Sequence, residues 1–139
     1  MFDIPLIKQK GTELCIPACV EMALRFLDKS IEIDQNDIMK QQWMNEKGYV
    51  PKDYQDRRDR GISFGSIKKI LEKLEIKRDV IFIKGKEEGK NPAIILESVK
   101  EILELKHVPV LISLKKTYNI CHIVLITGID GENFYYNNT

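Results

Sequence analysis

The stretch KQKGTELCIPACVEMALRFL, residues 8–27, places a glutamine six residues before a cysteine, and a helical pattern of apolar side chains follows that cysteine. The apolar positions are Ile16, Cys19, Val20, Met22, Ala23, Leu24, Phe26 and Leu27. Only Glu21 and Arg25 look solvated, which is typical of a helix that lies centrally in its domain. Pro17 suits the first helical turn, where no amide donor is needed. Cys15 is therefore predicted to lie at the N-terminus of this helix.

Three further helices are predicted from apolar periodicity and capping residues. They cover residues 35–43 (after Asp34), 64–74 (after Ser63) and 92–105 (after Asn91). Between the first two lies a polar stretch, residues 45–61, which reads as a loop insert. A loop of this length either borders a functional site or is a solvated insertion, and the sequence supports both readings equally.

Strand-like patterns dominate the last third of the chain. They cover residues 108–114, 122–129 and 133–138, after an earlier β-like segment at residues 77–83. Asp130 and Gly131 form a dipeptide that predicts a hairpin between the last two strands. Because helices come first and an antiparallel sheet comes last, we predict one α+β domain over residues 1–139 rather than a parallel sheet.

The overall composition excludes several classes of protein. Twenty-two Lys and Arg residues balance 21 Asp and Glu residues, so no strong attraction to nucleic acid is expected. No apolar run reaches the roughly 20 residues of a membrane span, and the first residues lack a signal-peptide pattern. Three cysteines are too few for a disulfide framework, and they predict a cytoplasmic protein. The oligomeric state is left open.

Cys15 is the first candidate for chemistry. A cysteine is most often a small buried apolar residue. At a helix N-terminus, however, a thiol faces unpaired backbone amides and the positive end of the helix dipole, and both stabilise the thiolate. Cys19, one turn inside the helix, has no such advantage and is predicted to be a core residue.

A thiolate nucleophile needs a base, and the chain has two histidines. His107 precedes a strand and reads as an exposed loop residue. His122 begins an apolar strand, where a buried histidine is the ordinary reading, but the predicted hairpin brings residues 137–139 across from it. A register that places Asn138 opposite His122 would let its amide orient the imidazole, and a slip of one residue would place Thr139 there instead.

Gln9 completes the candidate set, because a glutamine amide can donate to a developing oxyanion beside the nucleophile's own N–H. Zinc is a weaker alternative. Cys15, Cys19, Cys121 and His122 offer ligands, but the last two are adjacent in a strand and should point to opposite faces. The segment GKEEGK, residues 85–90, has the wrong spacing for a phosphate loop.

Residues 4–26, IPLIKQKGTELCIPACVEMALRF, resemble the opening of the C39-type papain-like cysteine peptidases, where a glutamine precedes the nucleophile by six positions. Residues 109–138, PVLISLKKTYNICHIVLITGIDGENFYYNN, are similar to the strand of that family that carries the catalytic histidine, followed by its hairpin. By position, the resemblance implies that Cys15 is the nucleophile, His122 the base, Gln9 the oxyanion donor and Asn138 the orienting residue. It also implies a papain-like fold with the nucleophile helix packed on the sheet.

The sequence also departs from that family. Leu14 and Ile16 stand where the usual residues are Asp and Gly, and Asn138 stands where these peptidases have Asp, although papain uses Asn. The separation of Cys15 and His122 is longer than in the peptidase domains of bacteriocin exporters. No transporter segment follows in the sequence, which favours a stand-alone peptidase, and whether the native chain continues past Thr139 stays open.

We therefore expect a cysteine peptidase that acts on a peptide or protein, such as a leader peptide, without a metal or organic cofactor. Two alternatives share the same residues. One is a C39-like domain that binds peptides without cleaving them. The other is a papain-like acyl or amide transferase, such as a deamidase or isopeptidase.

Overall fold

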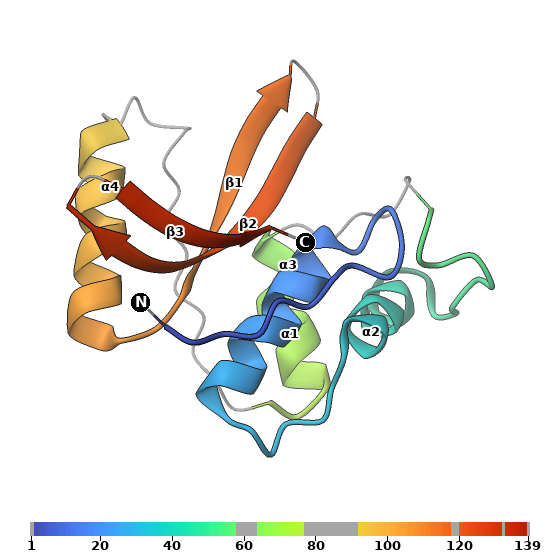
Figure 1. Cartoon of the computed structure of the whole chain (residues 1–139). Coiled ribbons are helices and arrows are strands. Elements are labelled where there is room, and N and C mark those ends of the chain that lie inside the picture. Colours follow the sequence, from blue (N-terminus) through green and yellow to red (C-terminus); the bar gives the residue numbers. More distant parts are fainter. Residues whose placement is uncertain (1, 58–63, 77–91, 118–119, 132, 139) are drawn as a thin grey trace.

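The computed structural model describes residues 2–57, 64–76, 92–117, 120–131 and 133–138 (Figure 1). Helices precede strands along the chain. In order, the elements are α1 (Cys15–Leu27), α2 (Gln35–Lys47), α3 (Phe64–Lys73), α4 (Pro92–Glu101), the short π-helix η2 (Ile102–Lys106), β1 (Val110–Thr117), β2 (Ile120–Asp130) and β3 (Asn133–Asn138). The predicted α+β fold is confirmed.

Helix α1 begins at Cys15, as predicted. Leu14 occupies the N-cap position without a side-chain cap, and its carbonyl accepts from the amide of Ala18 at 2.9 Å. Most of the helix is buried, since it packs against α2 on one side and β2 on another (Figure 1). The helix that carries the candidate nucleophile is thus central to the domain.

Helix α2 extends four residues beyond the predicted end at residue 43. A capping box between Asp34 and Asp37 starts it, and Gly48, with φ of +74°, ends it. The apolar periodicity stops at Trp43, but side-chain hydrogen bonds from Gln41 and Gln42 to residues one turn later continue along the last turn. The polar loop therefore begins at Gly48 rather than at residue 45.

Helix α3 lies where it was predicted, with Ile67, Ile70 and Leu71 buried. The helix predicted over residues 92–105 is divided into α4 and η2, and it ends at His107 with φ of +53°. His107 is exposed, as expected of a loop histidine. The β-like segment predicted at residues 77–83 lies outside the described residues.

The three strands form one antiparallel sheet in the order β1-β2-β3. Strand β1 pairs with β2 through partners such as Val110 and Ile126, and β2 pairs with β3 around the turn that contains Gly131, whose φ is +61°. The predicted hairpin is confirmed. One register shift between Ile126 and Gly128 marks a bulge in β2.

The two faces of β2 pack against different helices. Ile123 and Leu125 join Cys19 and Met22 of α1 in one buried cluster. Val124 and Ile126 join Val99 and Leu103, from α4 and η2, in another. The sheet is therefore a middle layer, with α1 on one face and α4 with η2 on the other (Figure 1). A third cluster joins α1 to α2 and α3.

Candidate active site

The Cys15 thiol lies where the first turn of α1 meets strand β2. Its side chain is half-buried beside the cluster that contains Cys19 and Ile123. The backbone amides of Ile16, in the same helical turn, and of Ile123, in β2, both hydrogen-bond the sulfur. The thiol is thus held between the amide-rich end of a helix and the strand residue that follows His122.

The environment of Cys15 acts on its ionisation in two opposite ways. Burial, the larger effect, raises the pKa of the thiol above its ordinary value of 9.0, and the carboxylate of Glu13 adds to this. The amide hydrogen bonds from Ile16 and Ile123 lower the pKa, which is the direction expected of a helix N-terminus. Because burial prevails, the net pKa of the Cys15 thiol lies above its ordinary value despite the helix end.

Cys19 behaves as the core residue that the sequence predicted. Its side chain is fully buried, and its Sγ donates to the carbonyl oxygen of Ile123 at 3.7 Å. Burial, assisted by the neighbouring Cys15, raises the pKa of the Cys19 thiol to about 12. The two cysteines, one helical turn apart, therefore differ in exposure and in the acidity of the thiol.

Gln9 lies in the extended segment before α1 and is half-buried. Its Nε2 amide group donates to the carbonyl oxygens of Gly11 at 2.8 Å and of Thr12 at 3.4 Å. These bonds hold the chain in the turn that leads into Cys15. To donate to an oxyanion, the same amide has to release one of these carbonyl oxygens and bind the substrate oxygen instead.

The polar loop after α2 contacts this turn. The backbone amide of Thr12 donates to Asp56 Oδ1 at 2.9 Å, and the amide of Glu13 donates to the carbonyl of Gln55 at 3.1 Å. The approach is so close that a Cβ on Gly11 would lie 2.6 Å from the Cβ and carbonyl oxygen of Gln55. The loop therefore packs against the turn that leads into Cys15.

The backbone register places His122 and Asn138 differently from the prediction. His122 pairs with Leu114 of β1, whereas Asn138 of β3 pairs with Val124, two positions along β2 from His122. The predicted pairing of Asn138 with His122 is wrong because the hairpin turn lies later in the chain, with Asp130 paired to Asn133, and the bulge in β2 offsets only part of that shift. The side chains of His122 and Asn138 lie outside the described part of the structure.

The neighbouring Asn137 has a different task. Its side-chain amide donates to the carbonyl of Ile4 at 3.0 Å and lies 3.6 Å from Met22 Sδ. Asn137 therefore ties the end of β3 to the N-terminal segment and to α1. This contact fixes the end of the hairpin against the helix that carries Cys15.

A buried polar network was missed by the sequence reading. Glu21, expected to be solvated, is only 3% exposed and pairs with Arg25 at 2.7 Å. Its second oxygen accepts from the backbone amide of Gln35, whose own side chain is fully buried. Glu21 interrupts the apolar pattern of α1 as a solvated residue would, so the sequence offered no signal for this network.

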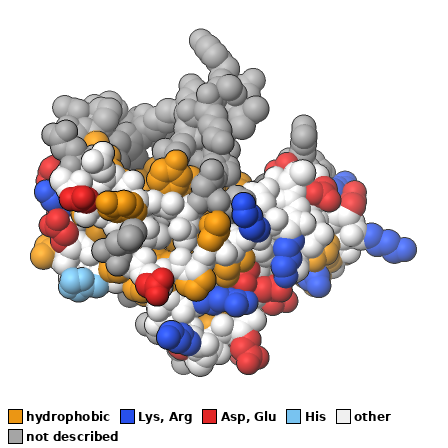
Figure 2. Space-filling view, in the orientation of Figure 1, with side chains coloured by type: hydrophobic (Ala, Val, Ile, Leu, Met, Phe, Trp, Pro, Cys, Tyr) orange, Lys and Arg blue, Asp and Glu red, His pale blue; other side chains and the backbone are white. Residues whose placement is uncertain are grey.

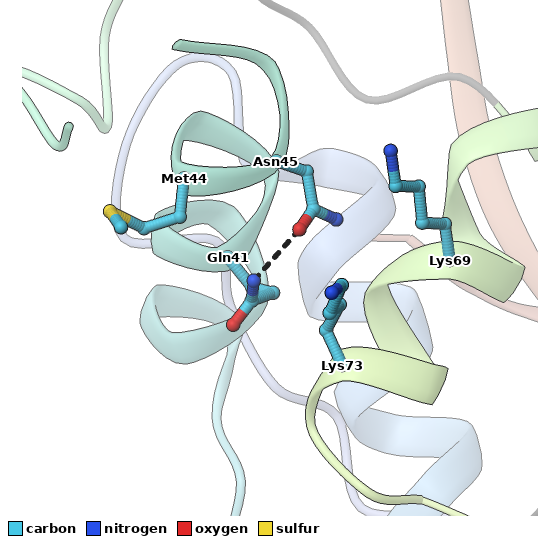
Figure 3. Close-up of a pocket in the computed structure, with 5 residues that line it drawn as sticks. All are labelled: Gln41, Met44, Asn45, Lys69 and Lys73. Carbon is cyan, nitrogen blue, oxygen red and sulfur yellow. Dashed lines mark hydrogen bonds between the residues drawn. The ribbon is translucent and has the colours of Figure 1, made fainter. Parts of the chain in front are cut away.

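The described surface also carries a hollow that is lined by other residues. A hollow of about 350 Å³ lies between α2 and α3, where Gln41, Met44, Asn45, Lys69 and Lys73 line it (Figure 3). It contains none of the predicted catalytic residues. Acidic and basic side chains lie interspersed on the face shown in Figure 2. Within the described ranges, no three His, Cys, Asp or Glu side chains gather to hold a metal ion, and no helix could cross a membrane.

Comparison with known proteins gives one result that covers the whole chain. The model of the Peptidase_C39 like family matches residues 1–139. Neither a curated protein nor a solved structure matches the sequence. The match therefore includes the helix that begins at Cys15, the strand that carries His122 and the end of the hairpin.

Proposed function

Since the chain belongs to the Peptidase_C39 like family, we propose that it is a cysteine peptidase whose nucleophile is Cys15. The observation that carries this proposal is the position of the thiol. It is only partly buried, it lies at the first residue of α1, and it accepts a hydrogen bond from the amide of Ile123, the residue after His122. Cys19 is too deeply buried for this role.

His122 is proposed as the base and as the cation that the buried thiol requires. Transfer of the thiol proton to the imidazole gives a thiolate–imidazolium pair. The sulfur then attacks the carbonyl carbon of the scissile peptide bond, and a C–S bond forms. When the C–N bond breaks, the imidazolium gives its proton to the leaving amine. Water activated by the neutral imidazole hydrolyses the thioester and restores the thiol.

Two donors are proposed for the oxyanion that forms during this attack. One is the backbone N–H of Cys15, which, as a first-turn amide, has no acceptor four residues earlier within the helix. The other is the side-chain amide of Gln9, released from the carbonyl of Gly11 when substrate enters. Because Gln9 donates to the turn that leads into Cys15, we propose that a single carbonyl oxygen of the substrate approaches both donors.

Asn138 is proposed to orient His122 from the neighbouring strand. Its backbone is at a position diagonal to His122 in the sheet, and such positions are about 7–8 Å apart. An amide side chain can span part of that distance. Asn138 is favoured over Asn137 because the side-chain amide of Asn137 is engaged with the carbonyl of Ile4. The proposed substrate is a peptide or protein, with leader peptides as one class to test.

One observation favours a second candidate function, a domain that binds peptides without cleaving them. Burial raises the pKa of Cys15, so little of the thiol is ionised at neutral pH unless a positive charge such as that of His122 lies nearby. A domain without that ion pair would retain the fold and the peptide-binding surface but not the reactivity.

A peptide library with mass-spectrometric detection tests the proposal. Wild-type protein should cleave a subset of peptides, and Cys15→Ala should abolish cleavage while leaving the thermal unfolding temperature near that of the wild type. Cys19→Ala, which removes a thiol one turn along the same helix, is the matched control and should retain cleavage. Peptides that bind without being cleaved, in wild type and Cys15→Ala alike, would favour the binding domain instead.

A further inference from the structure

We propose that Gln35, the first residue of α2, is a positioning residue that holds Gln9 beside Cys15. This inference rests on the proposed function, because it concerns how the oxyanion donor is placed. Gln35 is fully buried, although an apolar side chain would ordinarily occupy such a position. A buried amide is retained where its hydrogen bonds are needed.

The side-chain amide of Gln35 contacts the chain on both sides of Gln9. Its Oε1 accepts from the backbone amide of Lys10 at 2.8 Å, and its Nε2 donates to the backbone carbonyl of Lys8 at 2.9 Å. This pair of bonds resembles the pairing between two strands, with the amide in the place of a partner strand. The backbone of residues 8–10 is thereby fixed, and with it the point from which the Gln9 side chain leaves the chain.

Gln35 is in turn anchored to the nucleophile helix. Its backbone amide donates to Glu21 Oε2 at 2.9 Å, and Glu21 Oε1 pairs with Arg25 at 2.7 Å. Glu21 and Arg25 belong to α1, which begins at Cys15. A continuous set of hydrogen bonds therefore runs from α1 through Gln35 to the segment that carries Gln9, in addition to the covalent chain between Gln9 and Cys15.

The consequence of losing the Gln35 amide follows from its partners. Without it, the Lys8 carbonyl loses its donor and the Lys10 amide loses its acceptor in a partly buried place, and the segment must shift to reach water. Gln9 would move with the segment, whereas Cys15, fixed by α1 and by the amide of Ile123, would stay. The change should therefore weaken oxyanion stabilisation and spare thiolate formation.

A comparison of Gln35→Met with Gln42→Met tests this separation. Gln42 is also a buried glutamine of α2, but its Nε2 donates to Glu46 at 2.8 Å, away from residues 8–10. A tripeptide aldehyde forms a hemithioacetal with the nucleophilic thiol and places the former carbonyl oxygen at the oxyanion position, so it should bind Gln35→Met at least about tenfold more weakly. Alkylation of Cys15 by iodoacetamide, which forms no oxyanion, should stay within about twofold of the wild-type rate. Gln42→Met should leave both unchanged.

The double variant Gln9→Ala/Gln35→Met separates positioning from general damage. If Gln35 acts through Gln9, the double variant should bind the aldehyde no more weakly than Gln9→Ala alone. Additive losses, or equal losses of aldehyde binding and alkylation, would overturn the proposal. Should Gln35→Met not fold, Gln35→Glu keeps the acceptor for Lys10 and loses the donor to Lys8, and the same pattern is expected from it.

A readout independent of catalysis distinguishes failure of this inference from failure of the proposed function. In Gln35→Met, the Lys10 backbone amide should exchange faster with deuterium, and the side-chain amide NMR signals of Gln9 should shift. Both changes are expected even if the wild-type protein neither cleaves peptides nor binds the aldehyde. Absence of cleavage and of aldehyde binding would reject the proposed peptidase function but not the positioning role of Gln35. Unchanged Lys10 and Gln9 signals would reject the positioning role of Gln35.

Discussion

Replacement of His122 by alanine should change how the reactivity of Cys15 depends on pH. Burial raises the pKa of this thiol above 9.0. In His122→Ala, where no imidazolium is available, fewer than roughly 1 in 100 of these thiols would be ionised at pH 7. The alkylation rate should then rise about tenfold per pH unit between pH 6 and pH 9. In the wild type, an ion pair with His122 would keep the thiolate populated, and the rate should be nearly constant from pH 6 to pH 8.

The expected size of the difference follows from two opposing effects. Full ionisation gives the wild type an advantage of about 100-fold at pH 7, but a thiolate of lower pKa is a weaker nucleophile, which removes about tenfold. The net difference should be about tenfold at pH 7 and about 100-fold at pH 6. Iodoacetamide labelling followed by mass spectrometry of the Cys15 peptide measures this difference in rate. Cys121→Ser, a substitution at the residue next to His122, is the control. A wild-type rate that rises as steeply as that of His122→Ala would refute the ion pair.

Three further predictions concern stability and the turn before α1. Burial raises the pKa of Cys19 from its ordinary value of 9.0 to about 12 in the folded protein. The stability that the protonated Cys19 contributes is therefore present below pH 9 and is lost as the pH rises towards 12. The free energy of unfolding, measured in urea at pH 8 to pH 10.5, should therefore fall by about 1.4 kcal/mol per pH unit above pH 9 relative to Cys19→Ala, which lacks this slope. Asp34→Ala should cost about 1 kcal/mol at pH 7, as expected for loss of an N-cap. Partial burial raises the pKa of Asp34, but the Asp37 amide and Lys10 together lower it by more, so the net pKa is below its usual value. The cost of Asp34→Ala should therefore shrink when the urea titrations are repeated at acidic pH. Gly11→Ala should destabilise the fold by about 1–3 kcal/mol and alter Cys15 labelling, because the new Cβ meets the backbone of Gln55. Gly48→Ala, in open space with φ of +74°, should cost about 1 kcal/mol in the same urea titrations and leave labelling unchanged.

The features that the sequence predicted correctly depend on local patterns. The dense apolar periodicity after Pro17 located α1 and the position of Cys15, and alternation with a turn dipeptide located the last two strands. The fold class followed from the order of these elements. Each of these inferences needs only neighbours within a few residues.

The features that it missed depend on contacts across the fold. Glu21 is buried because Arg25 and the amide of Gln35 satisfy its two oxygens, and the second of these partners is fixed only when α2 packs on α1. The pairing of Asn138 was displaced because the hairpin turn lies later than predicted, with Asp130 paired to Asn133, and the bulge between Ile126 and Gly128 offsets only part of that shift. The roles of Cys15, Gln9, His122 and Asn138 in catalysis stay predictions.

The contact between the cysteine helix and β2 joins residues that are far apart in the chain. Cys19 and Ile123, whose carbonyl accepts from its sulfur, are separated by 104 positions. During synthesis, α1 leaves the ribosome long before β2 exists, so the strand that completes the surroundings of Cys15 arrives last. We expect a nascent chain halted before β2 to expose both thiols as ordinary cysteines. Reactivity specific to Cys15 would then appear only after the C-terminal strands have folded onto the helix, which would protect the cell from an active thiol on an unfinished chain.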